Sequence, residues 1–148
     1  MYIRAAPVSS VRGGLISRCA AVTPEAMTIT LRLATEDDIP AIRALMARAI
    51  AELQREFLSA AEIAASRAVM GLDTQLIADR SYFLAEVDGA LAGCGGWSAR
   101  ATLYGGDHSA DLRDARRLDP AREPARIRAM FTDPAFVRRG VGRAILDR

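Results

Sequence analysis

The sequence predicts a mixed α/β fold of the α+β type, with a mainly antiparallel sheet flanked by helices. Residues 39–53 place apolar side chains at helical spacing. Residues 82–97 contain two apolar runs joined by Asp88-Gly89, which is a strong hairpin signal. Residues 126–132 alternate in polarity ahead of a glycine-rich turn, as expected of a strand that leads into a helix.

The composition limits the classes of function. With 148 residues, of which 51% are hydrophobic and 26% charged, the chain can form one soluble domain with a core. The net charge of +2 is nearly balanced, so neither nucleic acid nor membrane is an expected partner. All 20 residues counted as Lys or Arg are arginine, which excludes a Schiff-base lysine and a P-loop lysine. No apolar run approaches the roughly 20 residues that span a bilayer.

Cysteine and histidine are too few for most metal chemistry. Cys19 and Cys94 lack the spacing of metal ligands and indicate reduced thiols in a cytoplasmic protein. Cys94 lies in an apolar run and is expected in the core. His108 is the only histidine, so a histidine-rich metal site is excluded and no metal is expected. A Ser-His-Asp triad would need His108, but no nucleophile-elbow sequence accompanies it.

The first 26 residues differ from the rest of the chain. They include three arginines and a Gly13-Gly14 pair, and they contain no acidic residue before Glu25. This pattern has features of a transit peptide, but a disordered extension ahead of a start at Met27 explains it better. We therefore expect a disordered segment at 1–26 and one folded domain at 27–148.

The folded region is expected to begin with a strand and a helix. Residues 28–33 alternate apolar side chains with β-branched or polar ones and predict the first strand. The helix over 39–53 should begin near Thr35, because Asp38 stands at the capping-box position and Pro40 is tolerated in a first turn. Its apolar stripe predicts that one face packs on the core.

A second helix and a hairpin follow. The helix should begin at Ser59, where Glu62 completes another capping box, and should end at Gly71 as a C-cap. The hairpin pairs residues 82–87 with residues 90–97.

Glycines and charges then mark irregular structure. Gly93, Gly95 and Gly96 weaken the second hairpin strand and indicate a bulge or the close approach of another group. Residues 98–104 are a candidate extension of the sheet. Residues 105–124 mix arginines with acidic residues, which predicts a mobile surface loop rather than a nucleic-acid patch.

The C-terminal stretch carries the functional signal. The strand at 126–132 breaks at Asp133-Pro134, and the chain then runs through two arginines and the Gly140-Val141-Gly142 sequence into a helix. Glycines allow close approach of a ligand, and the N–H groups at a helix start attract phosphate. An ordinary strand-to-helix connection is the alternative for this turn taken alone.

Taken with the order of elements, this turn resembles the acyl-CoA motif of the GNAT superfamily of acetyl-CoA-dependent N-acetyltransferases. Gly140 and Gly142 match the two small positions of that motif, whereas Val137 departs from the Gln or Arg of its opening position. The run LRLATEDDIPAIRALM also resembles the first strand and helix of the family. The resemblance covers residues 28–148.

The resemblance implies an enzyme that moves an acetyl group from acetyl-CoA, its co-substrate, to a primary amine by direct attack. A small-molecule or peptide amine is the implied acceptor, and a homodimer is left open. The pyrophosphate of CoA would be held by the backbone N–H groups of Arg138, Arg139, Gly140, Val141, Gly142 and Arg143. The pantetheine arm would pair with the backbone of Met130, Phe131 and Thr132, and one N–H of that strand would stabilise the oxyanion.

The catalytic acid and base are less clearly indicated. Glu86, Tyr104, Asp107 and His108 are candidates, and we select Tyr104 and His108 because a polar loop after a glycine-rich strand can border an acceptor site. Family members continue past the motif with further elements, including a helix whose tyrosine protonates the thiolate. We therefore expect residues 27–148 to be a partial, C-terminally truncated GNAT domain. The alternative is a non-catalytic CoA-binding module or an inactive truncated remnant of the fold.

Overall fold

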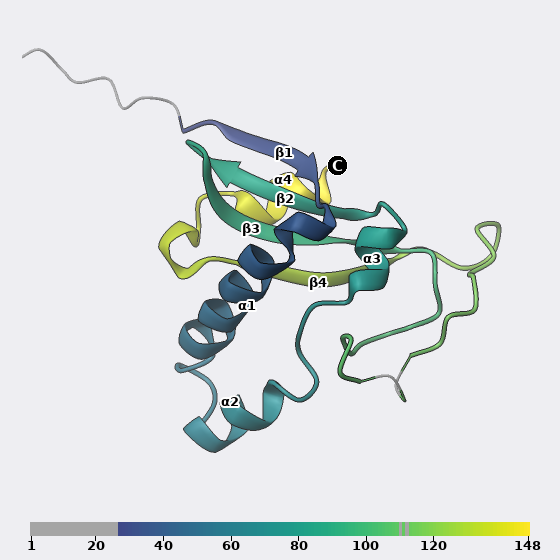
Figure 1. The fold of residues 1–148 in the computed structure, drawn as a ribbon, viewed down its shortest axis with the longest axis horizontal. Coiled ribbons are helices and arrows are strands. Elements are labelled where there is room, and N and C mark those ends of the chain that lie inside the picture. The colour runs from purple at the N-terminus through teal and green to yellow at the C-terminus, as the bar shows by residue number, and fades with distance from the viewer. Residues whose placement is uncertain (1–26, 110, 112) are drawn as a thin grey trace, which may run out of the picture.

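The computed structural model describes residues 27–109, 111 and 113–148, so the disordered extension predicted at 1–26 lies outside the described residues. Figure 1 shows a sheet with helices packed against it. The elements, in chain order, are β1 (Ile29–Leu33), η1 (Glu36–Asp38), α1 (Ile39–Leu53), α2 (Ala60–Ser66), α3 (Thr74–Ala78), β2 (Tyr82–Val87), β3 (Ala90–Ser98), β4 (Arg126–Thr132), η3 (Pro134–Phe136) and α4 (Val141–Leu146). In the described residues, no helix is both long and apolar enough to cross a bilayer.

The four strands form one sheet in the order β1-β2-β3-β4, and every neighbouring pair is antiparallel. This confirms the predicted α+β class and the hairpin. Asp88 and Gly89, at the hairpin turn, both have positive φ angles, of 50° and 80°. Two residues with positive φ are what a tight turn between twisted strands requires.

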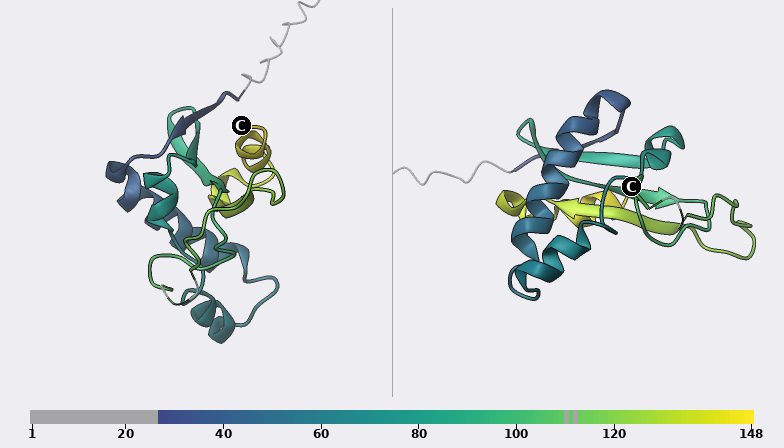
Figure 2. Two further views of the ribbon diagram at one scale, coloured as in Figure 1. Left: turned by 90° about the vertical axis from the view of Figure 1, so that its right-hand side faces the viewer. Right: turned by 60° about the horizontal axis from the view of Figure 1, so that its bottom comes forward.

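Each face of the sheet has its own apolar core. Tyr82, Leu84 and Cys94 belong to the core on the α1 side, together with Ile42 and Leu45 of α1. The opposite core contains Ala85 and Val87 of β2 and Ala92 of β3, covered by Val141 and Ile145 of α4. Figure 2 shows α1 and α4 on opposite sides of the sheet. The alternation of β2 therefore supplies both cores.

Both predicted capping boxes are present at the helix starts. The Asp38 carboxylate accepts the Thr35 N–H at 2.8 Å, and the Glu62 carboxylate accepts the Ser59 N–H at 2.8 Å. The second helix was predicted to continue to Gly71, but α2 ends at Ser66. The short helix α3 was not predicted, because its five residues are too few to show an apolar period.

The glycines of β3 confirm one of the two predicted alternatives, the close approach of another group, and one of them lies opposite a bulge in the neighbouring strand. A Cβ at Gly93 would collide with the Val141 side chain, so α4 approaches the sheet closely at this point. Opposite Gly95, the register of β3 and β4 shifts. Arg128 pairs with Gly96 and Phe131 with Cys94, which leaves two residues of β4 opposite one residue of β3. This arrangement is a β-bulge in β4.

Ala129 lies in the bulge and has a φ angle of 49°, which is unusual for a residue other than glycine. Its carbonyl accepts a hydrogen bond of 2.8 Å from the Tyr82 hydroxyl. Tyr82 is fully buried, and burial raises the pKa of its hydroxyl well above the ordinary value. The neutral hydroxyl is therefore a permanent donor that fixes the bulge from inside the core.

We expect Tyr82→Phe to lower the free energy of unfolding by about 1–2 kcal/mol, because the Ala129 carbonyl loses its partner. Urea unfolding followed by circular dichroism would measure the change. Tyr104→Phe is the matched control, since Tyr104 is 56% exposed and its hydroxyl should contribute little. Equal stabilities of the Tyr82→Phe variant and the parent protein would show that the bulge does not depend on this bond.

Candidate functional site

The glycine-rich turn between η3 and α4 presents a row of free backbone donors. Arg138 and Gly140 have φ angles of 64° and 82°, so the chain bends through two left-handed residues before α4 begins. Within the described residues, no hydrogen bond engages the backbone N–H groups of residues 137–143. Unpaired N–H groups in a bent backbone form a concavity that attracts anions.

The described structure gives no internal reason for a glycine at position 142. A Cβ at Gly142 would meet no atom within 4 Å, and the residue has no positive φ angle. Neither packing nor backbone conformation therefore requires glycine here, although glycine costs a helix about 1 kcal/mol relative to alanine. A group that lies against the backbone from the solvent side would account for the absence of a side chain.

Exposed guanidinium groups surround the turn. Arg139 lies over the Phe136 ring, 5.4 Å from its centroid, and Arg143 contacts Asp147 at 3.4 Å. Arg138 forms no ion pair within the described part of the chain. The segment predicted to hold pyrophosphate, residues 138–143, is thus one continuous basic turn with free N–H groups.

The strand predicted to hold the pantetheine arm lies at the edge of the sheet. Among the described residues, β4 pairs only with β3, so the other edge of β4 is open. Met130, Phe131 and Thr132 are half-buried; Met130 is the second residue of the bulge, and the other two follow it. An open edge offers N–H and C=O groups to an extended ligand.

Asp133 fixes the exit from β4 into the turn. Its carboxylate accepts two bonds from the Arg48 guanidinium of α1, at 2.9 Å and 2.6 Å, and caps η3 by accepting the Ala135 N–H at 3.0 Å. The sequence had indicated only a break at this aspartate. The ion pair with α1 could not be predicted, because 85 residues separate its partners.

The two predicted catalytic side chains line different hollows. Tyr104 borders a hollow along β4 that includes Ala129 and Phe131. His108 borders a cavity beside α1 instead. The other candidates are held by structural bonds: Glu86 accepts the Arg32 guanidinium at 2.8 Å, and Asp107 accepts the Thr74 N–H at 2.9 Å.

A buried polar network positions Tyr104. Arg128 of β4 is 4% exposed and donates to the carbonyls of Thr102 and Gly105, each at 2.9 Å. These two carbonyls flank Leu103 and Tyr104, so a single guanidinium holds both ends of this dipeptide against β4. Burial lowers the pKa of the Arg128 guanidinium, whereas the charge of Asp73 opposes that effect.

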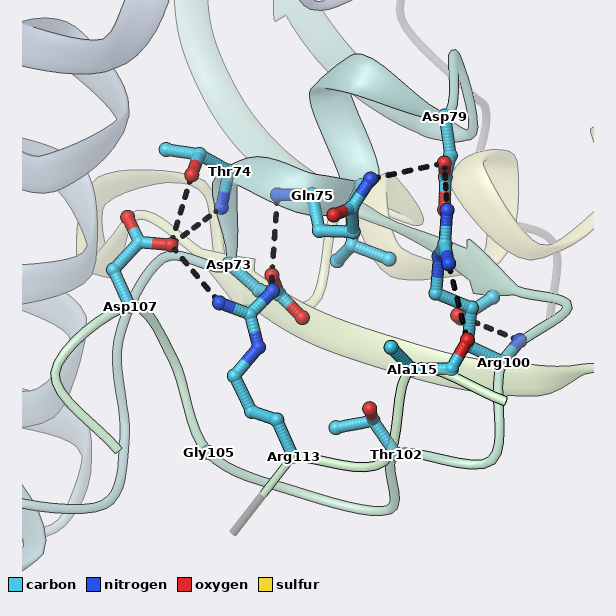
Figure 3. A network of polar contacts seen from close by, with 12 residues as sticks. Asp73, Thr74, Gln75, Asp79, Arg100, Thr102, Gly105, Asp107, Arg113 and Ala115 are labelled. Atoms are coloured by element: carbon cyan, nitrogen blue, oxygen red, sulfur yellow. Dashed lines mark hydrogen bonds and ion pairs between the residues drawn. The ribbon is translucent and has the colours of Figure 1, made fainter. Parts of the chain in front are cut away.

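Asp73 compensates the buried charge. Its carboxylate lies 3.1 Å from Arg128, is 3% exposed, and also accepts bonds from Arg113 and from the Gln75 N–H at the start of α3. Figure 3 shows Asp73 and Arg113 beside Asp107 and Thr74. The mobile surface loop predicted at 105–124 therefore contains well-anchored residues, including a buried Leu118.

The predicted extension of the sheet at 98–104 is reduced to one bridge between Arg100 and Arg117. Arg100 also binds the Asp79 carboxylate through two nitrogens, at 2.6 Å and 2.7 Å. Among the described residues, no three His, Cys, Asp or Glu side chains gather in the manner of metal ligands. Burial raises the pKa of the Cys94 thiol to about 11, which leaves it unreactive.

A scan against protein-family models and a search of curated proteins each find no match to this chain. Solved structures do match. The PaiA N-acetyltransferase of Thermoplasma acidophilum, in complex with coenzyme A, aligns with 81% of this chain at a TM-score of 0.51 and 11% identity. GCN5-related N-acetyltransferases of Ralstonia eutropha JMP134 and Kribbella flavida align with 82% and 81% of it, at TM-scores of 0.44 and 0.45 and identities of 21% and 12%.

The matched structures differ widely in length. This chain spans 68% of the Thermoplasma chain and 72% of the Ralstonia chain, but only 25% of the Kribbella chain and 32% of a matching chain from Pyrococcus horikoshii. The Thermoplasma match shows that the described residues have the GCN5-related N-acetyltransferase, or GNAT, fold. At this identity, the likeness extends to the fold alone.

We expect Asp73→Asn to cost about 3 kcal/mol or more in the free energy of unfolding, because it leaves the buried Arg128 charge uncompensated. Urea unfolding would measure the loss. Asp119→Asn is the control, since Asp119 is 51% exposed and its pair with Arg122 should contribute less than about 1 kcal/mol. Similar losses in the two variants would contradict the central role of the buried pair.

Proposed function

We propose that this chain, which has the GNAT fold, is an N-acetyltransferase that moves an acetyl group from acetyl-CoA to a primary amine. The observation that carries the proposal is the row of unpaired N–H groups at residues 137–143, which directly follows an open edge strand with a bulge. A CoA molecule needs both features: donors for its pyrophosphate and a strand edge for its amide-containing arm. The Thermoplasma relative of this fold binds coenzyme A.

The turn is proposed to hold the pyrophosphate through the N–H groups of residues 138–143. The guanidinium groups of Arg138, Arg139 and Arg143 add charge-assisted contacts. Val137, which stands where the family has Gln or Arg, contributes no charged contact. The absence of a side chain at Gly142 lets the phosphate reach the backbone.

The chemistry assigned to the site is acyl transfer. The amine nitrogen attacks the thioester carbonyl, a C–N bond forms, the C–S bond breaks, and sulfur leaves as the thiolate. The amine loses one proton and the thiolate gains one. Ala129 and Met130 face a single residue of β3, so a bulge N–H can leave the ladder and donate to the developing oxyanion.

Tyr104 is the side chain proposed to carry a proton. It borders the same hollow as Ala129 and Phe131, and Arg128 fixes its backbone on both sides. A hydroxyl near the bulge can donate to the departing sulfur. His108, the other side chain selected from the sequence, borders a separate cavity and is given a binding role below.

Isothermal titration with CoA tests the phosphate site. Gly142→Glu is expected to weaken binding at least about tenfold relative to Gly142→Gln, because the two side chains have the same size but only the glutamate repels phosphate. Both variants should keep the parent melting temperature, since the position faces open space. Absence of saturable heat from the parent protein, or equal affinities of the two variants, would overturn the site.

Release of free thiol from acetyl-CoA, measured across a panel of primary amines, tests turnover. Tyr104→Phe is expected to lower kcat about tenfold or more while leaving the KM for acetyl-CoA unchanged, because general acid catalysis contributes about 10²–10⁴. An unchanged kcat would exclude Tyr104 as the proton donor. Saturable CoA binding without thiol release from any amine would favour the alternative function, a non-catalytic CoA-binding module.

A further inference from the structure

A cavity of about 400 Å³ lies between α1 and the segment that follows α2. Its apolar lining comes from Met46 and Ile50 of α1 and from Met70 and Leu72. Its polar lining consists of Arg43, Arg67, Asp107 and His108. We call it the basic cavity. Its volume and its mixed lining are typical of a small-molecule site.

The donor side chains of the basic cavity, those of Arg43, Arg67 and His108, are exposed and have few partners within the protein. Within the described residues, Arg67 has no ion pair or side-chain hydrogen bond, and neither nitrogen of the His108 ring has a partner. Arg43 is 62% exposed and forms an ion pair with Asp107 at 3.6 Å. The other oxygen of Asp107 accepts both the N–H and the hydroxyl of Thr74, each at 2.9 Å. Arg67 and His108 therefore have no side-chain partner in the described protein, and Arg43 keeps donor N–H groups beyond its one ion pair, while the carboxylate is bound to the start of α3.

Gly71 determines where the His108 ring lies. A Cβ at Gly71 would stand 2.7 Å from the Cε1 atom of His108, so the imidazole rests where any other residue would place a side chain. Gly71 has no positive φ angle, which means that conformation does not require glycine here. The glycine makes room for an imidazole at the wall of the cavity.

The basic cavity lies beside two hollows along β4. It shares Met70 and Gly71 with the hollow that contains Tyr104 and Ala129. It shares Ile50 and Met70 with a third hollow, which runs along residues 130–132. The cationic side chains and the bulge of β4 therefore border neighbouring hollows that have Met70 as a common wall.

We propose that the basic cavity binds the carboxylate of the acetyl acceptor, so that the acceptor is an amino acid with an apolar side chain. Its amine would reach toward the bulge of β4, and its carboxylate would pair with Arg67, Arg43 and His108. This inference rests on the proposed acetyl transfer. The formal charge of the cavity favours a carboxylate over a phosphate, because two arginines and one aspartate leave +1 when histidine is neutral. Guanidinium groups bind carboxylates in a bidentate manner.

Binding at the cavity can be measured without any acetyl transfer. His108 is the only histidine, so its ring protons give one assigned set of NMR signals. Titration with N-acetyl-L-leucine should shift these signals saturably, whereas N-acetyl-L-leucine amide, which lacks the carboxylate, should not. Arg67→Gln should weaken the binding about tenfold, and Arg122→Gln, a change at an 85% exposed side chain, should leave it unchanged.

Equal shifts with the acid and the amide, no shift with either, or no effect of Arg67→Gln would overturn the assignment. Tighter binding of inorganic phosphate than of N-acetyl-L-leucine would also overturn it, because the cavity would then be a phosphate site.

Acetyl transfer supplies the second readout. L-leucine and 3-methylbutylamine have the same apolar side chain and amine, but only leucine has a carboxylate. We expect kcat/KM to be at least about tenfold higher for leucine than for the amine. Arg67→Gln should remove this preference. Transfer to both amines at equal kcat/KM would overturn this inference and leave the proposed function standing. Transfer to no amine would overturn the proposed function and the acceptor assignment together, whatever the NMR titration shows.

Discussion

The site depends on one buried cation. Arg128 on β4 loses its hydration when the chain folds, and this loss must be offset by acceptors of the protein. The acceptors are the Asp73 carboxylate and the carbonyls of Thr102 and Gly105, which come from two parts of the chain. Collecting them brings the start of α3 and the segment after β3 against the edge strand. The dipeptide that contains Tyr104 is thereby held next to the bulge.

The second constraint acts within β4 itself. A left-handed conformation at Ala129 costs about 1–2 kcal/mol, and the bulge is stable because Tyr82 binds its carbonyl from the core. The core thus stabilises the irregular backbone to which the proposal assigns the oxyanion contact. Ala129 therefore takes part both in the hydrogen bonding of the core and in the bulge that the proposed chemistry uses.

Local signals were sufficient for most of the fold. The capping boxes at Thr35 and Ser59, the Asp88-Gly89 turn and the alternation of 126–132 each depend on neighbouring residues, and the structure confirms them. Contacts between distant residues could not be read in this way. In the sequence Arg113 is one charge among many in a predicted surface loop, whereas its partner in the structure, Asp73, lies 40 residues away.

The two parts of the candidate site differ in the same way, since one is formed by neighbouring residues and the other by distant ones. The turn at 138–143 is contiguous in sequence, so its glycines and arginines could be recognised together. The basic cavity is not contiguous, since Arg43 and Arg67 lie on separate elements and His108 lies in a later loop. Gly71 is the one sequence signal for this cavity. The sequence predicts a helix C-cap there, but α2 ends at Ser66 and the glycine accommodates an imidazole.

The chain has no lysine, so its permanent side-chain cations are all guanidinium groups. This holds for the buried networks, the glycine-rich turn and the basic cavity. A guanidinium stays protonated at any physiological pH and is a very poor nucleophile toward thioesters. A chain without lysine therefore presents no side-chain amine to the activated acetyl group that it is proposed to hold. Its ion pairs are protected from self-acylation, and reagents directed at amines would find no lysine to modify.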